Sequence, residues 1–292
     1  KVREEGTAVQ PSPEALALTQ NKITMRSRLS ELDIPQPRWS VLGDNTDVEE
    51  ALGAVGGFPC VAKKPSGGYD GKGVRIIDSL DDCAEWIAEG EVLLEELVLF
   101  RRELAQLSAR RPNGEWSSWP VVETRQEDGV CAEVIAGLEE PDGAVSMKAL
   151  AIAERIASGI DVVGVLAVEL FETAEGEILV NELAMRPHNS GHVLTELSRT
   201  SQFEQHLRAV ADVPLGATDF VAPFGVMTNV FGAMSLEGQS RAWEEFPQAK
   251  IHSYQKEARP GRKVGHVVVV GSDLDIVLDQ ARKARDIVQG AS

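Results

Sequence analysis

The glycine-rich stretch at residues 65–73, Pro-Ser-Gly-Gly-Tyr-Asp-Gly-Lys-Gly, constrains the fold of this chain more than any other feature. Four glycines within seven residues let backbone N–H groups approach a ligand and form a concave surface that binds anions. Two common nucleotide-binding loops are excluded. A Walker A loop needs Ser or Thr after its Gly-Lys pair, but Lys72 is followed by Gly73. A dinucleotide-binding loop must open a helix, but residues 74–77 are predicted to form a strand.

We therefore expect a hairpin loop between strands at residues 58–64 and 74–77, with Lys63 and Lys64 at the end of the first strand. Such a loop suits a cover over the phosphates of a ligand. A surface hairpin whose lysines are solvated fits the same spacing, and the pattern alone does not decide between the two.

The charge of the chain limits its partners. It has 292 residues, with 29 Lys and Arg against 46 Asp and Glu, a net charge of −17 and a pI near 4.8. General binding to nucleic acid or to an anionic membrane needs clustered positive charge, so neither is expected. No apolar run approaches the roughly 20 residues of a membrane span. Three widely spaced cysteines match neither a disulfide framework nor a metal site, which favours a reducing, cytoplasmic location.

The order of helix and strand patterns predicts an α+β fold with many antiparallel strand pairs, in two lobes and a C-terminal cap. Ser12-Pro13-Glu14 is typical of a helix start, and we expect that helix to reach about Leu32. Further helices are expected at residues 46–55, from 79, at 144–158, at 201–211 and from 273. Further strands are expected at residues 91–99, 104–109, 130–135, 163–171, 177–183, 226–231, 250–254 and 266–270.

Two acids in neighbouring predicted strands could form a metal site. Alternation places Glu169 and Glu182 among apolar residues of their strands, and the residues between the strands, 172–177, are even in number. A regular hairpin would therefore put both carboxylates on one side of the ribbon. Such acids repel each other unless a cation intervenes, and oxygen ligands near phosphates favour Mg²⁺. Two solvent-facing glutamates on an edge hairpin fit the pattern equally well.

Two further segments carry groups that bind phosphate. Residues 186–192, Arg-Pro-His-Asn-Ser-Gly-His, directly follow the second of these strands, and residues 256–263 hold four basic side chains in eight positions. Arginine binds phosphate oxygens bidentately, so both segments are candidates for a phosphate monoester site. A hydrogen-bonded turn and a solvated basic turn, respectively, are the alternatives.

Four segments, in this order, resemble the 5-(carboxyamino)imidazole ribonucleotide synthase family of ATP-grasp enzymes. They are residues 67–73, Asn181-Glu182 leading into residues 186–192, residues 200–209 (Thr-Ser-Gln-Phe-Glu-Gln-His-Leu-Arg-Ala) and residues 259–266 (Arg-Pro-Gly-Arg-Lys-Val-Gly-His). The likeness runs from about Val9 to about Val270. It implies a carbon–nitrogen ligase of purine biosynthesis that uses ATP, Mg²⁺ and bicarbonate to carboxylate 5-aminoimidazole ribonucleotide through carboxyphosphate. It also implies a homodimer.

The resemblance also implies residue roles. Bicarbonate and the reacting groups would be positioned by Tyr69, Lys72 and Arg186, and Mg²⁺ would be held by Glu169 and Glu182. The phosphate of the imidazole nucleotide would face Arg186, Lys256, Arg259 and Arg262. ATP would contact Lys22, Lys63, Gly68, Tyr69, Asp70, Gly71, Lys72, Gly73, Glu95, Glu96, Val98, Glu103, Gln126, Asn181 and Glu182.

The implied fold is an ATP-grasp fold, with two α+β lobes that grip ATP and a small β-rich C-terminal domain. The expected division is residues 1–12 as the remnant of, or linker from, a Rossmann-like N-terminal domain, 13–98 as the small lobe with its glycine-rich lid, 99–215 as the large lobe with the metal site, and 216–292 as the C-terminal domain. Gln126 stands where relatives often have His, and Met185 where Pro is common. Another carboxylate-activating ATP-grasp ligase and a nucleotide-binding regulator without turnover are the competing functions.

Overall fold

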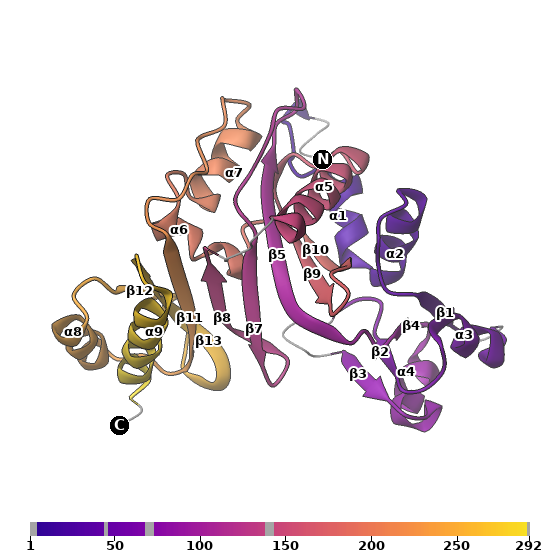
Figure 1. Ribbon diagram of the computed structural model, residues 1–292. Helices are drawn as coiled ribbons and strands as arrows, with labels where there is room; N and C mark the ends of the chain where they lie inside the picture. Colours follow the sequence, from indigo (N-terminus) through magenta and orange to yellow (C-terminus); the bar gives the residue numbers. More distant parts are fainter. Residues whose placement is uncertain (1–4, 44–45, 68–72, 138–142, 291–292) are drawn as a thin grey trace.

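Two antiparallel sheets and their helices make up the chain (Figure 1). The computed structural model describes residues 5–43, 46–67, 73–137 and 143–290. Every strand pair in these ranges is antiparallel, which confirms the expected α+β class with two lobes and a C-terminal cap. No helix of the described residues combines the length and the apolar composition of a membrane span.

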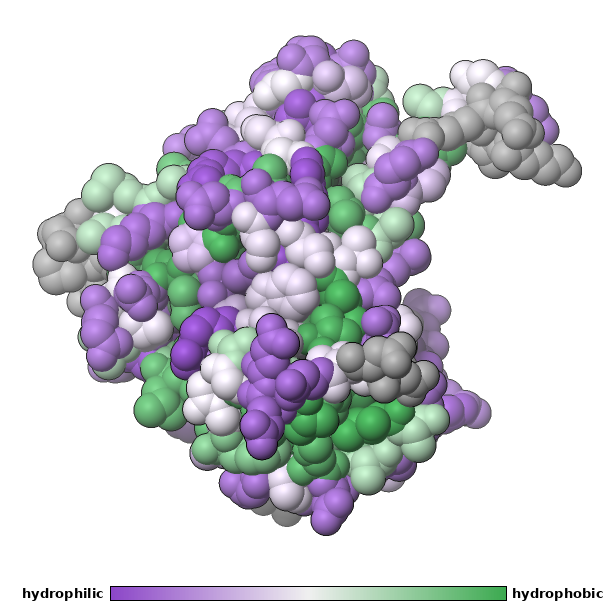
Figure 2. All heavy atoms as spheres, turned by 90° about the vertical axis from the view of Figure 1, so that its right-hand side faces the viewer, coloured by the Kyte–Doolittle hydropathy of each residue, from purple (hydrophilic) through white to green (hydrophobic). Residues whose placement is uncertain are grey.

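The small lobe is a four-stranded sheet in the order β1-β4-β2-β3, at the right of Figure 1. Its strands are β1 (Trp39–Leu42), β2 (Cys60–Lys63), β3 (Val74–Ile77) and β4 (Val92–Glu96), with helices α3 (Val48–Val55) and α4 (Ala84–Glu89) and the short helix η2 (Leu80–Cys83). Alternate residues of these strands form a core with α3 and α4. The end of β2 and the start of β3, which pair at Lys63 and Val74, flank the glycine-rich segment, as predicted. Figure 2 looks onto this lobe, where hydrophilic and hydrophobic side chains are interspersed.

The second sheet has nine strands, in the order β10-β9-β5-β7-β8-β11-β13-β12 with β6 beside β5. The strands are β5 (Phe100–Arg110), β6 (Trp116–Ser118), β7 (Val122–Glu127), β8 (Val130–Ala136), β9 (Gly164–Thr173), β10 (Ile178–Ala184), β11 (Phe224–Gly232), β12 (Lys250–Ser253) and β13 (Arg259–Gly271). One sheet therefore runs from the hairpin that carries Glu169 and Glu182 to the strand that carries Lys263.

Helices cover both faces of this sheet. On one face α1 (Pro13–Gln20), α2 (Lys22–Glu31) and α5 (Ala144–Gly159) pack over β9 and β10, where Ile156 and Leu166 share a core. On the other face lie η3 (Asn189–Gly191), α6 (Leu194–Leu197) and α7 (Gln202–Val210). Farther along the sheet, on the same face as α5, α8 (Leu236–Glu245) and α9 (Leu274–Gln289) pack over β11 and β13 at the left of Figure 1. Each fully buried aliphatic side chain contributes roughly 1.5–3 kcal/mol, so these faces fix the sheet firmly.

The first helix differs from its prediction. It ends at Gln20, and a second helix starts at Lys22, because Asn21 adopts an extended conformation (φ −132°, ψ 118°) and its side-chain oxygen accepts hydrogen bonds from the backbone N–H groups of Ile23 and Thr24. An Asn in this position caps a new helix rather than continuing the old one. The break turns Lys22 and Arg26 toward the space between the two sheets.

Several elements are longer than predicted or were not predicted. Strand β13 starts at Arg259 rather than 266, because its basic end pairs with β11 although it lacks apolar alternation. Strand β7 and helix α8 were missed; β7 exposes its last three residues and α8 contains Gly238, which weakens both patterns. The predicted strand at 91–99 ends at Glu96, and residues 97–99 connect the two sheets.

Candidate active site

A cavity of about 1060 Å³ lies between the two sheets. The small lobe contributes Lys63, Arg75 and Val98 to its lining, whereas the nine-stranded sheet contributes Glu103 and Glu169. The predicted site residues that line it are Lys22, Lys63, Glu95, Glu96, Val98, Glu103, Gln126, Glu169, Asn181, Glu182 and Arg186. Residues that are far apart in the sequence are thus gathered in one space.

The two predicted metal-ligating acids lie directly opposite each other in β9 and β10. Glu182 pairs with Glu169, and both line the cavity. The physical reason differs from the predicted one. The hairpin pairs Ile178 with Glu172, which leaves an odd number of residues between them, and a β-bulge at Asn181 then shifts the register. A bulge sets two residues against one, so Asn181 and Glu182 together oppose Glu169.

Two lysines reach this bulge from different elements. Lys22 Nζ, at the start of α2, lies 3.1 Å from Glu182 Oε1. Lys63 Nζ, at the end of β2, lies 3.1 Å from Asn181 Oδ1 and 2.8 Å from Glu95 Oε2. Glu182 keeps 43% of its side chain exposed toward the cavity. Two cations and two carboxylates therefore surround one solvent-accessible space.

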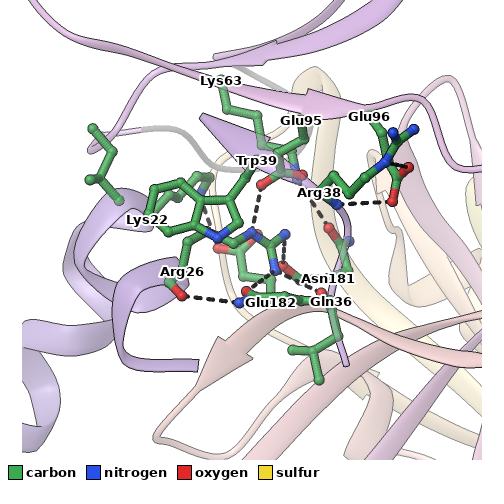
Figure 3. Close-up of polar contacts among 12 residues, drawn as sticks. Lys22, Arg26, Gln36, Arg38, Trp39, Lys63, Glu95, Glu96, Asn181 and Glu182 are labelled. Atoms are coloured by element: carbon green, nitrogen blue, oxygen red, sulfur yellow. Dashed lines mark hydrogen bonds and ion pairs between the residues drawn. The ribbon is translucent and has the colours of Figure 1, made fainter. Parts of the chain in front are cut away.

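Beneath the lysines lies a buried charge network (Figure 3). Arg26 Nε donates to Glu95 Oε1 at 2.7 Å, and the Glu95 side chain is almost fully buried. Burial alone would raise the pKa of Glu95, but the charges of Arg26 and Lys63 outweigh it and hold the pKa below its usual value. Burial lowers the pKa of the Lys63 ammonium, and the attraction of Glu95 offsets only part of that effect. Glu95 was expected to contact ATP, but its two carboxylate oxygens bind these two cations.

Glu169 also contacts the segment that follows β10. His188 Nε2 lies 3.2 Å from Glu169 Oε1. Burial opposes ionisation of Glu169, but the hydrogen bond from His188 and the positive charges of Lys63 and Lys263 outweigh it and lower the pKa of the carboxyl group. Glu169 is therefore ionised near neutral pH, as a cation ligand must be.

Glu103 is the opposite case. It lies on β5 beside Glu169, and burial, together with the charge of Glu169, raises its pKa to about 7, although a hydrogen bond with Gln126 lowers it in part. A perturbed carboxyl group in a cleft is a frequent mark of a functional site. Glu103, one of the expected ATP contacts, is therefore a group that titrates near neutral pH.

The connection between the sheets forms the apolar end of the cavity. Val98 and Phe100 line it, and Phe100 stacks on Phe171 of β9 with ring centroids 4.7 Å apart. The Glu96 carboxylate accepts hydrogen bonds from the backbone N–H and the guanidinium of Arg38 at 2.9 and 2.6 Å, so its side chain supports the connection (Figure 3). Apolar side chains beside backbone groups at one end of a cavity suit a nucleotide base.

Part of the predicted site lies elsewhere. Gly68, Tyr69, Asp70, Gly71 and Lys72 fall outside the described residues, whereas Gly73 is described and has φ +79°. Lys256, Arg259 and Arg262 do not line the cavity; they lie in the connection from β12 to β13 and at the start of β13. Arg259 pairs with Glu257 at 2.9 Å, and Lys256 Nζ lies 5.0 Å above the ring of Tyr254. From the same strand, Lys263 does reach the cavity.

The donor set fits a magnesium ion that is completed by a ligand. Among the described residues, no group of three or more His, Cys, Asp or Glu side chains is placed to hold a metal by itself. Glu169 and Glu182 supply two carboxylates and Asn181 one amide oxygen, and Mg²⁺ is usually bound by one or two carboxylates plus phosphate oxygens and water. The site can therefore hold Mg²⁺ together with a nucleotide, but it has too few ligands to cage the ion alone.

Three residues of the site had no predicted role. His188 and Lys263 stand within the two segments quoted for phosphate binding, so their neighbourhood signalled them. Arg26 had no signal, because a basic residue in a helix is most often solvated, and only the fold buries it.

The chain resembles known proteins over nearly its whole length. Residues 27–203 match the ATP-grasp domain, and residues 225–280 match the phosphoribosylaminoimidazole carboxylase C-terminal domain. The N5-carboxyaminoimidazole ribonucleotide synthase of Mycobacterium tuberculosis is 45% identical over 295 residues, which cover 97% of this chain and 68% of that protein.

Solved structures agree with this result. The synthetase from Thermotoga maritima is 37% identical, with a TM-score of 0.84 over 98% of this chain and 76% of that one. The synthase from Aspergillus clavatus in complex with ADP and 5-aminoimidazole ribonucleotide is 30% identical, with a TM-score of 0.87 over 99% of this chain and 77% of that one. The chain belongs to the N5-carboxyaminoimidazole ribonucleotide synthase family of ATP-grasp enzymes.

Proposed function

We propose that this chain carboxylates 5-aminoimidazole ribonucleotide in de novo purine biosynthesis, using ATP and bicarbonate and releasing ADP and phosphate. The observation that carries the proposal is the cavity between the two sheets, in which Lys63, Glu169 and Glu182 converge from three strands. The Aspergillus clavatus relative with ADP and the imidazole nucleotide supports the same pair of ligands for this chain.

The γ-phosphoryl group of ATP would pass to a bicarbonate oxygen, and the nucleotide's amine would then attack the carbonyl carbon of carboxyphosphate as phosphate leaves. Phosphoryl transfer depends mostly on positioning and charge neutralisation, which is what Lys22 and Lys63 offer to the ATP phosphates. Glu103 would accept hydrogen bonds from the ribose hydroxyls, and the backbone from Glu96 to Val98 would contact the adenine. The remaining proposed ATP contacts among the described residues are Gln126, Asn181 and Gly73.

Glu169 and Glu182 would hold Mg²⁺, with Asn181 beside them. A bound Mg²⁺ supplies charge neutralisation at the phosphate oxygens of ATP. His188 would keep the Glu169 carboxylate oriented toward the ion, because it bonds one oxygen and leaves the other available. The low pKa of Glu169 supports this role, since only the ionised form is a good ligand.

We assign the phosphate of the imidazole nucleotide to Arg186, Lys256, Arg259 and Arg262. Arg186 is exposed at the cavity wall, and the other three lie on the segment that leads to Lys263, which supports a binding region on that side of the cavity. Tyr69 and Lys72 are proposed to position bicarbonate from the family resemblance alone. We also propose a homodimer, residues 13–98, 99–215 and 216–292 as the small lobe, large lobe and C-terminal domain, and a cytoplasmic location, which three free cysteines support.

The reaction is tested by ADP release and by incorporation of labelled bicarbonate, each with and without 5-aminoimidazole ribonucleotide. We expect both signals to depend on that nucleotide. Absence of ADP release would contradict the proposal and favour a nucleotide-binding regulator, whereas ADP release that is indifferent to the nucleotide would contradict it and favour another carboxylate-activating ligase.

The same assay tests the metal site. Glu182→Gln should lower turnover by about a hundredfold or more at saturating Mg²⁺, because a neutral amide is a poor ligand for the ion. Glu175→Gln is the matched control, since Glu175 is exposed in the turn of the same hairpin, and it should keep the wild-type rate. A Glu182→Gln variant with wild-type turnover would rule out the metal assignment.

A further inference from the structure

Arg26 is the most completely buried charged side chain near the cavity. It lies on α2, its exposed fraction is 0%, and it does not itself line the cavity. Its guanidinium donates to four groups on three segments, which Figure 3 shows around it. A buried guanidinium is retained only when such partners compensate for its lost hydration.

Two of these hydrogen bonds fix the β-bulge of β10. Arg26 Nη1 donates to the carbonyl oxygen of Val180 at 2.7 Å, and Nη2 donates to the carbonyl oxygen of Asn181 at 2.9 Å. These are the carbonyls at the register shift, where a bulge leaves backbone groups without a ladder partner. The planar fork of arginine matches two adjacent acceptors, so Arg26 holds the backbone that presents Asn181 and Glu182 to the cavity.

The two remaining hydrogen bonds run to Glu95 in the small lobe and to Gln36 in the segment that leads into it. Arg26 Nε binds one oxygen of Glu95, whose other oxygen binds Lys63 at 2.8 Å. Lys63 in turn contacts Asn181 Oδ1, so the chain of contacts closes on the bulge where it began. A ring of bonds thereby joins α2, β4, β2 and β10, and it couples both sheets at the point where the phosphates of ATP are expected.

We propose that Arg26 is a positioning residue. It holds the β10 bulge and Lys63, which belong to different sheets, in the relative positions that MgATP binding requires. The inference rests on the proposed function for its reaction readout, but not for its nucleotide-binding readout. Arg26 acts through Asn181, Glu182 and Lys63 and touches neither nucleotide nor metal. A lysine at this position would offer a point charge to Glu95 without the fork that spans two carbonyls.

The test compares Arg26→Lys with Arg28→Lys, which changes a partly exposed arginine two residues away on the same helix. For Arg26→Lys we expect the KM for ATP to rise by about tenfold to a hundredfold and the thermal midpoint to fall, because two buried carbonyls lose donors, whereas the KM for 5-aminoimidazole ribonucleotide stays close to wild type. Arg28→Lys should leave both KM values unchanged. An Arg26→Lys variant with the wild-type KM for ATP would overturn the proposal, as would equal increases in both KM values.

A binding experiment separates this idea from the reaction. ADP affinity is measured by calorimetry with and without Mg²⁺, and the wild-type gain from Mg²⁺ should shrink by about tenfold in Arg26→Lys. This readout stands even if the chain does not carboxylate the imidazole nucleotide. An undiminished gain would overturn the proposal.

A double variant distinguishes positioning from simple charge balance. Arg26→Met alone leaves Glu95 with one cation in a buried site and is expected to lose stability for that reason, so it is combined with Glu95→Gln. Positioning predicts that the folded double variant still lacks the Mg²⁺-dependent gain in ADP affinity, because the two bulge carbonyls have lost their donors. Recovery of that gain would mean that Arg26 serves only to neutralise Glu95, and would overturn the proposal.

Discussion

At the scale of single residues, two neighbouring carboxyl groups on one sheet have pKa values that are shifted in opposite directions. Glu169 is held below its usual pKa because His188, Lys63 and Lys263 outweigh its burial. Among the described residues no cation acts on the Glu103 carboxyl group in this way; burial and the charge of Glu169 raise its pKa to about 7. The environment therefore keeps one acid ionised for a cation and leaves the other half protonated, which is how sites divide roles between like groups.

Glu103 predicts a pH dependence of nucleotide binding. Its ionised fraction rises from about one tenth at about pH 6 to about nine tenths at about pH 8, and only the carboxylate accepts hydrogen bonds from both ribose hydroxyls. The KM for ATP should thus fall by up to about tenfold over this range. Initial rates at several pH values measure it, with Glu103→Gln as the comparison, because a glutamine cannot titrate. A Glu103→Gln profile as steep as that of the wild type would refute this role.

At the scale of elements, patterns predicted which side chains meet but not how the backbone brings them together. Glu169 and Glu182 were expected on one side of a regular hairpin, whereas the turn gives the other register and the bulge at Asn181 restores the pairing. Bulges leave little trace in apolar alternation, and this one depends on Arg26, which is 154 residues away in the sequence from Val180. A non-local hydrogen bond of this kind has no local signal to read.

The helices show the same limit. Ser12-Pro13-Glu14 predicted the start of α1, where Ser12 is the N-cap and Pro13 the first helical residue, because caps are local chemistry. Asn21 is also a local cap, but the apolar spacing around it continued and hid the break. The strand β13 was predicted only over its apolar half, since its basic half is held by pairing with β11 rather than by burial.

The basic half of β13 carries a proposed phosphate contact, Arg262. Arg262 donates to the backbone oxygen of Glu257 at 3.3 Å, and the proposed role of its remaining donors is to bind the phosphate of 5-aminoimidazole ribonucleotide. Arg262→Ala should raise the KM for that nucleotide by about tenfold to a hundredfold, since charged hydrogen bonds contribute about 1.5–3 kcal/mol, and leave the KM for ATP nearly unchanged. Arg241→Ala, which removes an exposed arginine from α8, is the control. Equal effects of Arg262→Ala on both substrates would exclude the assignment.

At the scale of the whole molecule, a stack of histidines joins the C-terminal strands to the segment that follows β10. His266 of β13 stacks on His192 at 4.3 Å and on His252 at 4.5 Å, and its Nδ1 lies 2.7 Å from the hydroxyl of Tyr254. Burial, followed by the charges of neighbouring histidines, lowers the pKa of His192 to about 4 and that of His266 to about 2. His192 and His266 are therefore neutral imidazoles near neutral pH, and their protonation is disfavoured.

This junction predicts how stability changes with pH. An unfolded histidine takes up a proton near pH 6.5, whereas folded His192 does so only near pH 4, so the unfolded state binds more protons between these values. His192 therefore contributes its full stabilisation above about pH 6.5 and loses about 1.4 kcal/mol per pH unit as the pH falls toward 4. Glu103 has the opposite sign, because its raised pKa makes the folded state bind more protons between about pH 4.5 and 7.

Only a comparison of variants isolates the histidine contribution from that of Glu103 and other acids. Urea unfolding of the wild type and of His192→Gln, followed between about pH 7.5 and 5, should give a free energy of unfolding that falls less steeply for the variant, by about 1.4 kcal/mol per pH unit below pH 6. Loss of ring stacking lowers the variant's stability equally at every pH, so the slope rather than the level carries the result. Parallel slopes would show that folded His192 titrates like an unfolded histidine, and would contradict its lowered pKa.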